Sequence, residues 1–270
     1  MTKREFASML AEELKKEGMD AEADHIFRAD GTYEAVVIKA GPGLPCPRIP
    51  VDGLFEAYET GTDLDQIREA FVKQAREAAS LLPADVMQVQ DWTWAKKNMV
   101  LRLVPEGRDE YLAAHVCRPV ADIHAVCCCL LNDEAAVTVT PSLMEGWGVS
   151  EDQLYKAAGD NTVPTLPDLS ELLSMGQTSP AMTVLTTSSG RFGAGAVLHE
   201  GVQEKLDTLY PEGFYLLPSS IHEWIAVGKD NAPDDLKRMV KDINRTVLCP
   251  QDILSDNIYT LEGGVLKVVC

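Results

Sequence analysis

Two apolar runs that meet at a short polar corner, between Gly213 and Val227, constrain the fold more than any other part of the chain. Runs of this length with so short a connection predict an antiparallel hairpin. Similar adjacent runs occur at 123–131 with 135–140 and at 257–261 with 265–269. Paired strands interspersed with helices predict an α+β fold, with mixed or mostly antiparallel sheets and packed helices, rather than a regular βαβ series.

Helix starts are marked by residues whose side chains accept hydrogen bonds from free backbone amides. Thr2 and Asp63 each precede an amphipathic stretch, and both are good N-cap residues. Ser150 is followed three positions later by Gln153, which is the spacing of a capping box. Pro233 is typical of the first turn of a helix. We therefore expect helices to begin at these four places.

A short helix, a turn and a capped helix are predicted twice, each time after an extended segment. Two interpretations stay open: a duplicated unit that forms two similar α/β lobes, or chance similarity between amphipathic helix pairs. We expect either an N-terminal α/β lobe at 1–110 and a C-terminal α/β lobe at 111–270, or one continuous domain. The two matching regions are Leu54–Tyr58 with Asp63–Ile67, and Leu143–Trp147 with Ser150–Leu154.

The chain is acidic, with 42 Asp and Glu against 24 Lys and Arg among 270 residues and a net charge of −18. A field of this sign repels phosphate, and basic pairs such as Lys237-Arg238 are isolated in sequence. We therefore expect no nucleic-acid partner and no membrane partner. No apolar run approaches the roughly 20 residues of a membrane span, and the start, Met1–Phe6, is charged. These features predict a soluble, cytoplasmic protein.

Cysteine and histidine positions do not predict a metal site. Three of the seven cysteines are consecutive, Cys127–Cys129, and neighbours on a strand point to opposite faces. Paired C-x-x-C motifs and the H-E-x-x-H pattern are both missing from the sequence. We therefore expect a buried strand of reduced thiols and no metal or other cofactor.

The corner between the two apolar runs holds the densest group of reactive side chains. It contains Pro218, Ser219, Ser220, His222 and Glu223, and serine, histidine and glutamate can serve as nucleophile, base and orienting acid. On an extended strand, however, His222 and Glu223 point to opposite faces, and Ser220 lies roughly 7 Å from His222 along the strand. A tight turn in which the serines satisfy backbone groups is the favoured interpretation.

A second candidate is the glycine-bearing loop between an expected strand and a helix. Ser189, Gly190, Gly193 and Gly195 could direct backbone N–H groups at an anion. The loop lacks the lysine and hydroxyl residue of a phosphate-binding P-loop, and it also lacks the third glycine of a dinucleotide fingerprint. A structural turn is therefore the favoured interpretation, and anion binding stays the alternative.

The corner also carries a family resemblance. Gly213–Glu223, followed by an apolar strand, resembles a bacterial domain-of-unknown-function family whose members are often found beside mobile genetic elements. Further similar segments are Val139–Leu154, Gly195–Leu198 and Leu254–Tyr259. The resemblance is clearest over 120–260 and extends in outline to the N-terminal third. It implies a cytoplasmic α+β protein and brings no established reaction, cofactor or catalytic residue.

Two functions follow as hypotheses. The first is a non-enzymatic accessory or interaction protein that presents the loop 218–223 to a protein partner, since no complete catalytic motif is found in the sequence. The second is a hydrolase or transferase with a dispersed site that uses His222 with Ser219 or Ser220. A pocket lined by His222 and a second polar group would favour the enzyme.

Overall fold

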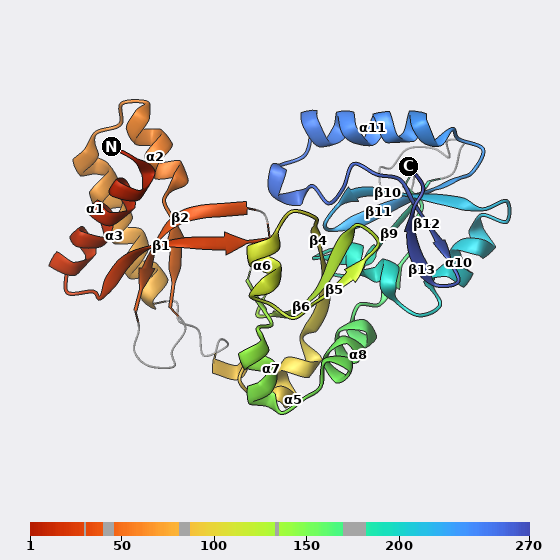
Figure 1. Cartoon of the computed structure of the whole chain (residues 1–270), viewed down its shortest axis with the longest axis horizontal. Helices are drawn as coiled ribbons and strands as arrows, with labels where there is room; N and C mark the ends of the chain where they lie inside the picture. Colours follow the sequence, from red (N-terminus) through yellow and green to blue (C-terminus); the bar gives the residue numbers. More distant parts are fainter. Residues whose placement is uncertain (30, 40–45, 81–86, 133–134, 170–181) are drawn as a thin grey trace. The chain divides into compact units, whose positions relative to one another are not determined.

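The computed structural model describes residues 1–29, 31–39, 46–80, 87–132, 135–169 and 182–270 (Figure 1). Its contacts divide the chain into two compact units, Met1–Gln88 and Val89–Cys270. This division differs in place from the expected boundary at 110/111. Strand β4 (Met99–Pro105) pairs along its whole length with β6 (Ile123–Leu130), so one sheet contains residues from both sides of that position. Helices and antiparallel sheets together confirm the α+β class.

The first unit combines helices with an antiparallel sheet of order β1-β2-β3. Thr2 caps α1 as predicted: its hydroxyl accepts from the Glu5 amide at 3.2 Å, and the Glu5 carboxylate accepts from the Thr2 amide at 2.7 Å. Asp63 accepts from the amides of the first turn of α3. The elements are α1 (Lys3–Lys16), β1 (Ala21–Arg28), β2 (Gly31–Ile38), β3 (Arg48–Pro50), α2 (Asp52–Glu59) and α3 (Leu64–Ser80).

An apolar core joins these helices to the sheet. Phe6 and Leu10 of α1 are fully buried, as is Phe71 of α3, and Val36 of β2 lies in the same cluster. The Phe6 and Phe55 rings meet edge to face with centroids 5.4 Å apart. The amphipathic pattern of the sequence therefore places its apolar stripes against one sheet, as burial of nonpolar surface favours.

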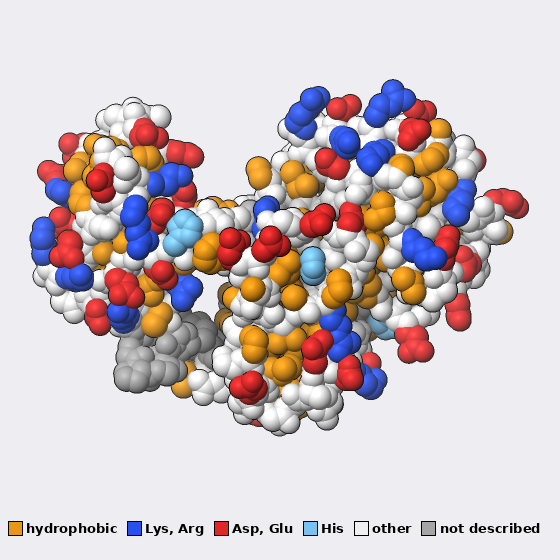
Figure 2. Space-filling model, viewed as in Figure 1, with side chains coloured by type: hydrophobic (Ala, Val, Ile, Leu, Met, Phe, Trp, Pro, Cys, Tyr) orange, Lys and Arg blue, Asp and Glu red, His pale blue; other side chains and the backbone are white. Residues whose placement is uncertain are grey.

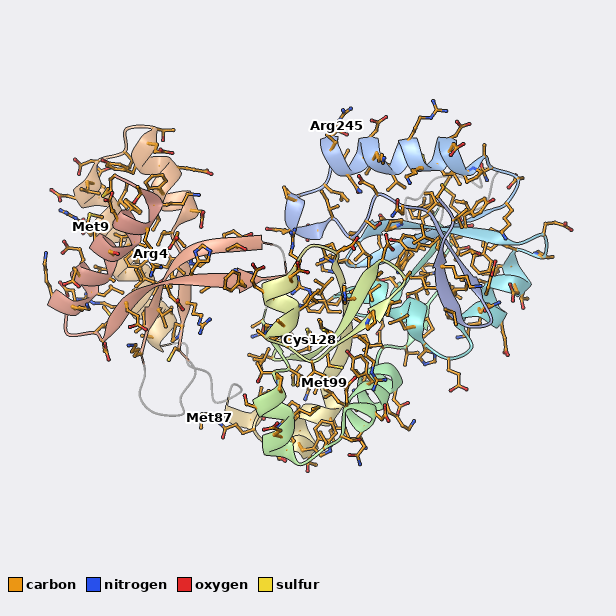
Figure 3. The ribbon with its side chains drawn as sticks, in the orientation of Figure 1. Arg4, Met9, Met87, Met99, Cys128 and Arg245 are labelled. Carbon is orange, nitrogen blue, oxygen red and sulfur yellow. The ribbon has the colours of Figure 1, made fainter. Side chains whose placement is uncertain are left out.

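The second unit begins with a sheet in which β6 is the central strand. The strand β4 lies on one edge of β6, while β5 and β7 share the other edge. Cys127 and Cys129 pack with buried side chains of α5 and α8. Cys128, labelled in Figure 3, lies between them on β6, so strand alternation directs its side chain to the opposite face of the sheet. The prediction of a buried cysteine strand is confirmed. The other elements here are α5 (Trp92–Lys97), α6 (Asp109–Ala113), β5 (Cys117–Val120), β7 (Ala136–Thr138), α7 (Pro141–Trp147) and α8 (Glu151–Asn161).

A second antiparallel sheet, of order β13-β12-β10-β11-β9-β8, completes this unit. The predicted hairpins β10–β11 and β12–β13 are both present. Helix α11 packs on the sheet through Leu236 and Val240, which contact the cluster that contains Leu217 and Val227. The elements are β8 (Pro164–Thr165), β9 (Thr183–Thr187), the 3-10 helix η1 (Gly193–Leu198), α10 (Val202–Leu209), β10 (Phe214–Ser220), β11 (Glu223–Gly228), α11 (Pro233–Thr246), the 3-10 helix η2 (Pro250–Asp252), β12 (Tyr259–Glu262) and β13 (Val265–Val268).

Part of each unit has a similar order of elements. In the first unit a helix precedes the long strands β1 and β2, and the short strand β3 and two helices follow. In the second unit α5 precedes β4 and β6, and the short strand β7 precedes α7 and α8. Both short strands pair near the C-terminal end of the central strand. Helix α6 and strand β5, inserted between β4 and β6, have no counterpart in the first set.

Within the described ranges, no helix is both long enough and apolar enough to cross a bilayer.

Candidate functional site

The corner 218–223 forms a tight hairpin turn whose polar groups bond to one another. Ile221 and His222 make the turn between β10 and β11. The Ser220 hydroxyl accepts from the His222 amide at 3.0 Å, and the Ser219 hydroxyl donates to the Glu223 carboxylate at 3.0 Å. Pro218, Ser220 and Ile221 are buried. The corner is therefore inserted into the protein, and His222 and Glu223 keep part of their surface in solvent.

His222 is held by main-chain and ring contacts with Phe192. The Phe192 amide donates to His222 Nδ1 at 3.1 Å, so the neutral ring carries its proton on Nε2. That nitrogen faces Asp252 Oδ1 at 3.7 Å. The two rings stack with an interplanar angle of 6°, and the Arg102 guanidinium lies over the Phe192 ring, 4.7 Å from its centroid. This arrangement fixes the position of the corner relative to the glycine loop.

The glycine loop owes two of its glycines to close packing. A side chain at Gly195 would collide with the carbonyl oxygen of Leu101, and one at Gly193 would lie 2.9 Å from the Thr187 amide. Gly190, Gly193 and Gly195 each donate their amide to a carbonyl of the same loop or of β9. The Ser189 hydroxyl lies 3.3 Å from that of Thr187. Because these amides already donate to carbonyl groups of the protein, the structure adds no support for anion binding by this loop. That interpretation rests on the sequence pattern alone.

The segments that carry the family resemblance meet around two buried aromatic side chains. Trp224, which follows the corner, donates its indole N–H to the Ala194 carbonyl at 2.8 Å. Its ring meets Tyr259 edge to face at 5.1 Å. The Ile221 amide donates to the Asp252 carbonyl at 2.8 Å. The corner, the glycine loop and the segment 252–259 therefore form one connected structure.

Asp122, in the turn between β5 and β6, joins the β4-β6-β5 sheet to the segment 252–259. Asn257 donates to Asp122 Oδ2 at 2.7 Å, and the Tyr259 hydroxyl lies 2.7 Å from Asp122 Oδ1 and 2.7 Å from Ser255 Oγ. Burial, together with the nearby carboxylates of Asp122 and Glu106, raises the pKa of Tyr259 far above its usual value. The phenol is therefore protonated at neutral pH and donates to the carboxylate, since Asp122 can only accept.

Asn244 of α11 ties the helix to the same segment. Only 6% of the residue is exposed, and its amide nitrogen donates to the Ser255 carbonyl at 3.0 Å and to the Asp256 carboxylate at 2.8 Å. A buried amide with two good acceptors holds α11 and the segment 255–257 in a defined position. The polar network therefore runs from α11 to Asp122.

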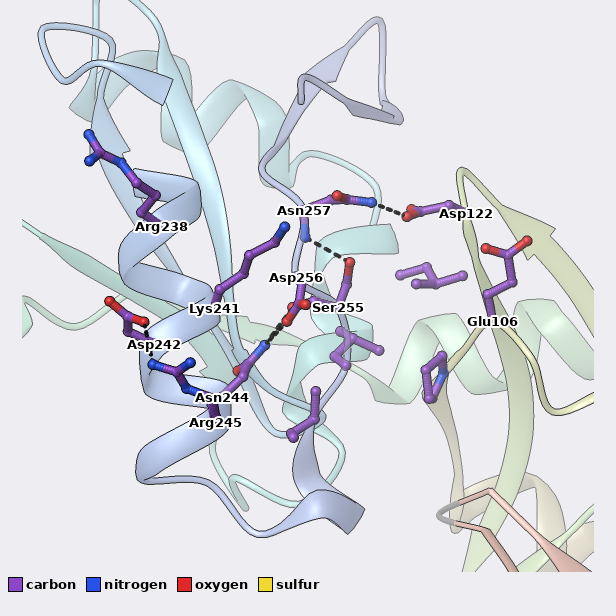
Figure 4. A pocket seen from close by; sticks show the side chains of 14 residues that line it. Glu106, Asp122, Arg238, Lys241, Asp242, Asn244, Arg245, Ser255, Asp256 and Asn257 are labelled. Atoms are coloured by element: carbon purple, nitrogen blue, oxygen red, sulfur yellow. Dashed lines mark hydrogen bonds and ion pairs between the residues drawn. The ribbon is translucent and has the colours of Figure 1, made fainter. Parts of the chain in front are cut away.

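A pocket of about 840 Å³ lies over this network, between α11, the segment 253–257 and the β5–β6 turn (Figure 4). Its volume is within the range of small-ligand sites. His222 and the glycine loop do not line it. The lining residues are Pro105, Glu106, Asp122, Ile123, Arg238, Lys241, Asp242, Asn244, Arg245, Ile253, Leu254, Ser255, Asp256 and Asn257.

The basic wall of this pocket is a feature that sequence reasoning missed. Lys237 and Arg238 look isolated in the sequence, but the lining residues Arg238, Lys241 and Arg245 follow one another at spacings of three and four residues. Such spacing aligns side chains along one side of a helix. Figure 2 shows Lys and Arg side chains over α11. The spacing of these basic residues could be read from the sequence once the segment was recognised as helical. The approach of Glu106 and Asp122 to the same pocket could not be read from the sequence.

Among the residues that the structure describes, no group of three or more His, Cys, Asp and Glu side chains has the geometry of a metal site.

Comparison with known proteins gives one match. The model of a family of unknown function, DUF5688, matches residues 3–262. No curated protein and no solved structure matches the chain. The match covers nearly the whole sequence, including both compact units, the corner and the segment 254–259. The chain therefore belongs to the DUF5688 family.

Proposed function

We propose that this chain is a non-catalytic binding protein and that the pocket beside α11 is its recognition site. One observation carries the proposal: segments around 105, 122, 238–245 and 253–257 meet at one space of about 840 Å³. Its floor is already held by the hydrogen bonds of Asp122, Asn244 and Tyr259. A preformed polar floor lowers the conformational entropy lost on binding, which favours recognition of a ligand.

The contacts of the corner favour binding over catalysis. Ser219 is bonded to Glu223, and Ser220 accepts from a backbone amide. Among the described contacts, neither serine hydroxyl bonds to the ring of His222. A nucleophile needs a base within hydrogen-bond reach, and the ring instead contacts Phe192 and Asp252. The hydrolase or transferase alternative therefore has no supporting contact.

The corner 218–223 contacts the segment that forms one wall of the pocket. Ile221 holds the Asp252 carbonyl, His222 faces the Asp252 carboxylate, and the next residue, Ile253, lines the pocket. In this proposal the 218–223 corner does not bind the partner alone but sets the position of the segment that does. The ligand is a protein segment or a small molecule. Because no disulfide links the described cysteines, we also propose a reducing, cytoplasmic location, and the family resemblance adds a bacterial one.

A pair of matched substitutions tests the proposal. Ile253→Trp places a large ring at the half-buried pocket wall, whereas Ile243→Trp makes the same change on α11 at a position, 40% exposed, that does not line the pocket. The chain and both variants would be screened by protein-observed NMR against a library of metabolites and short peptides. We expect ligands whose binding is lost in Ile253→Trp and kept in Ile243→Trp. A library without such ligands would refute the proposed site.

A further inference from the structure

The charged residues that line the pocket differ in whether they already have partners. Arg238 pairs with Asp235, and Arg245 pairs with Asp242 at 3.2 Å, in both cases within α11. On the remaining walls, Asp122 accepts from Asn257 and Tyr259, and Asp256 accepts from Asn244. Each of these side chains therefore has a hydrogen-bond or ion-pair partner without a ligand.

Two lining charges are left over. Lys241 and Glu106 make no hydrogen bond or ion pair with any residue that the structure describes, although both line the same pocket. They come from different walls: Lys241 from α11, and Glu106 from the end of β4 (Figure 4). Glu106 lies close enough to raise the pKa of Tyr259, so its charge acts on the polar floor. The pocket therefore offers one cation and one anion at separate places.

Apolar side chains complete the lining between these charges. Ile123 and Leu254 are buried, and Pro105 and Ile253 are half-buried. The polar groups of the floor are used by one another, so they add few free donors or acceptors for a ligand. Discrimination must then come from the two unpartnered charges and from the apolar surface, because a charged group recognises its opposite and an aliphatic wall favours an aliphatic group.

We infer that the pocket takes a dipolar ligand of the peptide class. Its carboxylate lies at Lys241, its ammonium group at Glu106, and its aliphatic middle against Ile123, Leu254 and Ile253. This inference rests on the proposed function and adds the chemistry of the ligand. A volume of about 840 Å³ accommodates a short peptide with free ends.

Four peptides of one sequence test this assignment. Alanyl-leucyl-alanine is compared with its N-acetylated, its C-amidated and its doubly blocked form, and each dissociation constant is measured by isothermal titration calorimetry. Blocking either end should weaken binding about tenfold, since a charge-assisted hydrogen bond contributes this much or more. Lys241→Met should remove the effect of amidation and keep that of acetylation. Glu106→Gln should do the reverse.

Matched controls separate pocket charges from net charge. Lys237→Met lies one turn from Lys241 on the same side of α11, and Glu110→Gln lies on the exposed start of α6; neither position lines the pocket. Both controls should leave all four constants unchanged.

Three outcomes would overturn the inference in distinguishable ways. If the four peptides bind the unmodified chain equally, or if Lys241→Met and Glu106→Gln alter both end effects together, the dipolar assignment is wrong. If no peptide binds while other ligands do so in an Ile253→Trp-sensitive manner, the ligand class is wrong and the proposed site stands. If nothing binds in that manner, the proposed site fails as well.

Discussion

Replacing Tyr259 by Phe tests whether the buried hydroxyl holds the pocket floor together. The side chain is fully buried, and its hydroxyl lies 2.7 Å from Asp122 Oδ1 and 2.7 Å from Ser255 Oγ. Loss of a hydrogen bond to a carboxylate costs about 1.5–3 kcal/mol, and loss of a neutral one adds about 1 kcal/mol. Asn257 still donates to Asp122, so the carboxylate is not left without a partner. We therefore expect the free energy of unfolding of the second unit to fall by about 3 kcal/mol.

Urea denaturation followed by tryptophan fluorescence measures this change in the right part of the molecule. All four tryptophans, at positions 92, 94, 147 and 224, belong to the second unit, and Trp224 contacts Tyr259 directly. Tyr215→Phe is the matched control, because the Tyr215 hydroxyl makes no hydrogen bond with any described residue. The control should change stability by less than about 0.5 kcal/mol. The reasoning is refuted if Tyr259→Phe leaves the free energy of unfolding as unchanged as the control does, or if both variants lower it equally.

Three further predictions concern packing, pH and capping. Gly195→Ala should destabilise the second unit by about 3 kcal/mol, because the added Cβ would collide with Leu101. The control Gly159→Ala, on an open side of α8, should stabilise the unit by about 0.5–1 kcal/mol. Urea midpoints that shift in the same direction for both variants would contradict this reasoning. Burial raises the pKa of Cys129 to about 12. The unfolded thiol ionises near pH 9, so the stabilisation is fully present below that value and is lost as pH rises toward the folded pKa. Cys129→Ala should reduce the fall in stability between about pH 9 and pH 12, and an unchanged slope would count against this. Ser150→Ala should cost about 1 kcal/mol in the same assay by removing the capping box of α8, and no measurable loss would mean that the cap contributes little.

Local sequence pattern was sufficient for most elements with a clear start or strong periodicity. The caps at Thr2, Asp63 and Ser150 and the hairpin around the corner are all found in the structure. These features depend on residues within a few positions of one another, so the chain carries the information locally. Strand β1 (Ala21–Arg28) was not predicted, because its alternation is weak and it exists through pairing with β2.

The candidate site, in contrast, depends on long-range contacts and not on local sequence pattern. The corner 218–223 attracted a functional hypothesis because it concentrates serine, histidine and glutamate, yet the fold uses the two serines for internal hydrogen bonds. Residues such as Glu106 and Lys241 are unremarkable in sequence and become neighbours of one pocket only through the two sheets and α11. Their separation of more than 130 positions leaves no local signal.

The amino-acid pattern alone established an acidic α+β protein with paired strands, capped helices and a buried strand of cysteines, since charge, periodicity and capping are local properties of the chain. Folding decided which polar groups remain available to a ligand. The side chains of Asp122, Asn244 and Tyr259 form hydrogen bonds across the fold. The lining side chains of Lys241 and Glu106 form none with the residues that the structure describes. Whether a polar group is free depends on its neighbours in space, and long-range contacts alone set those neighbours.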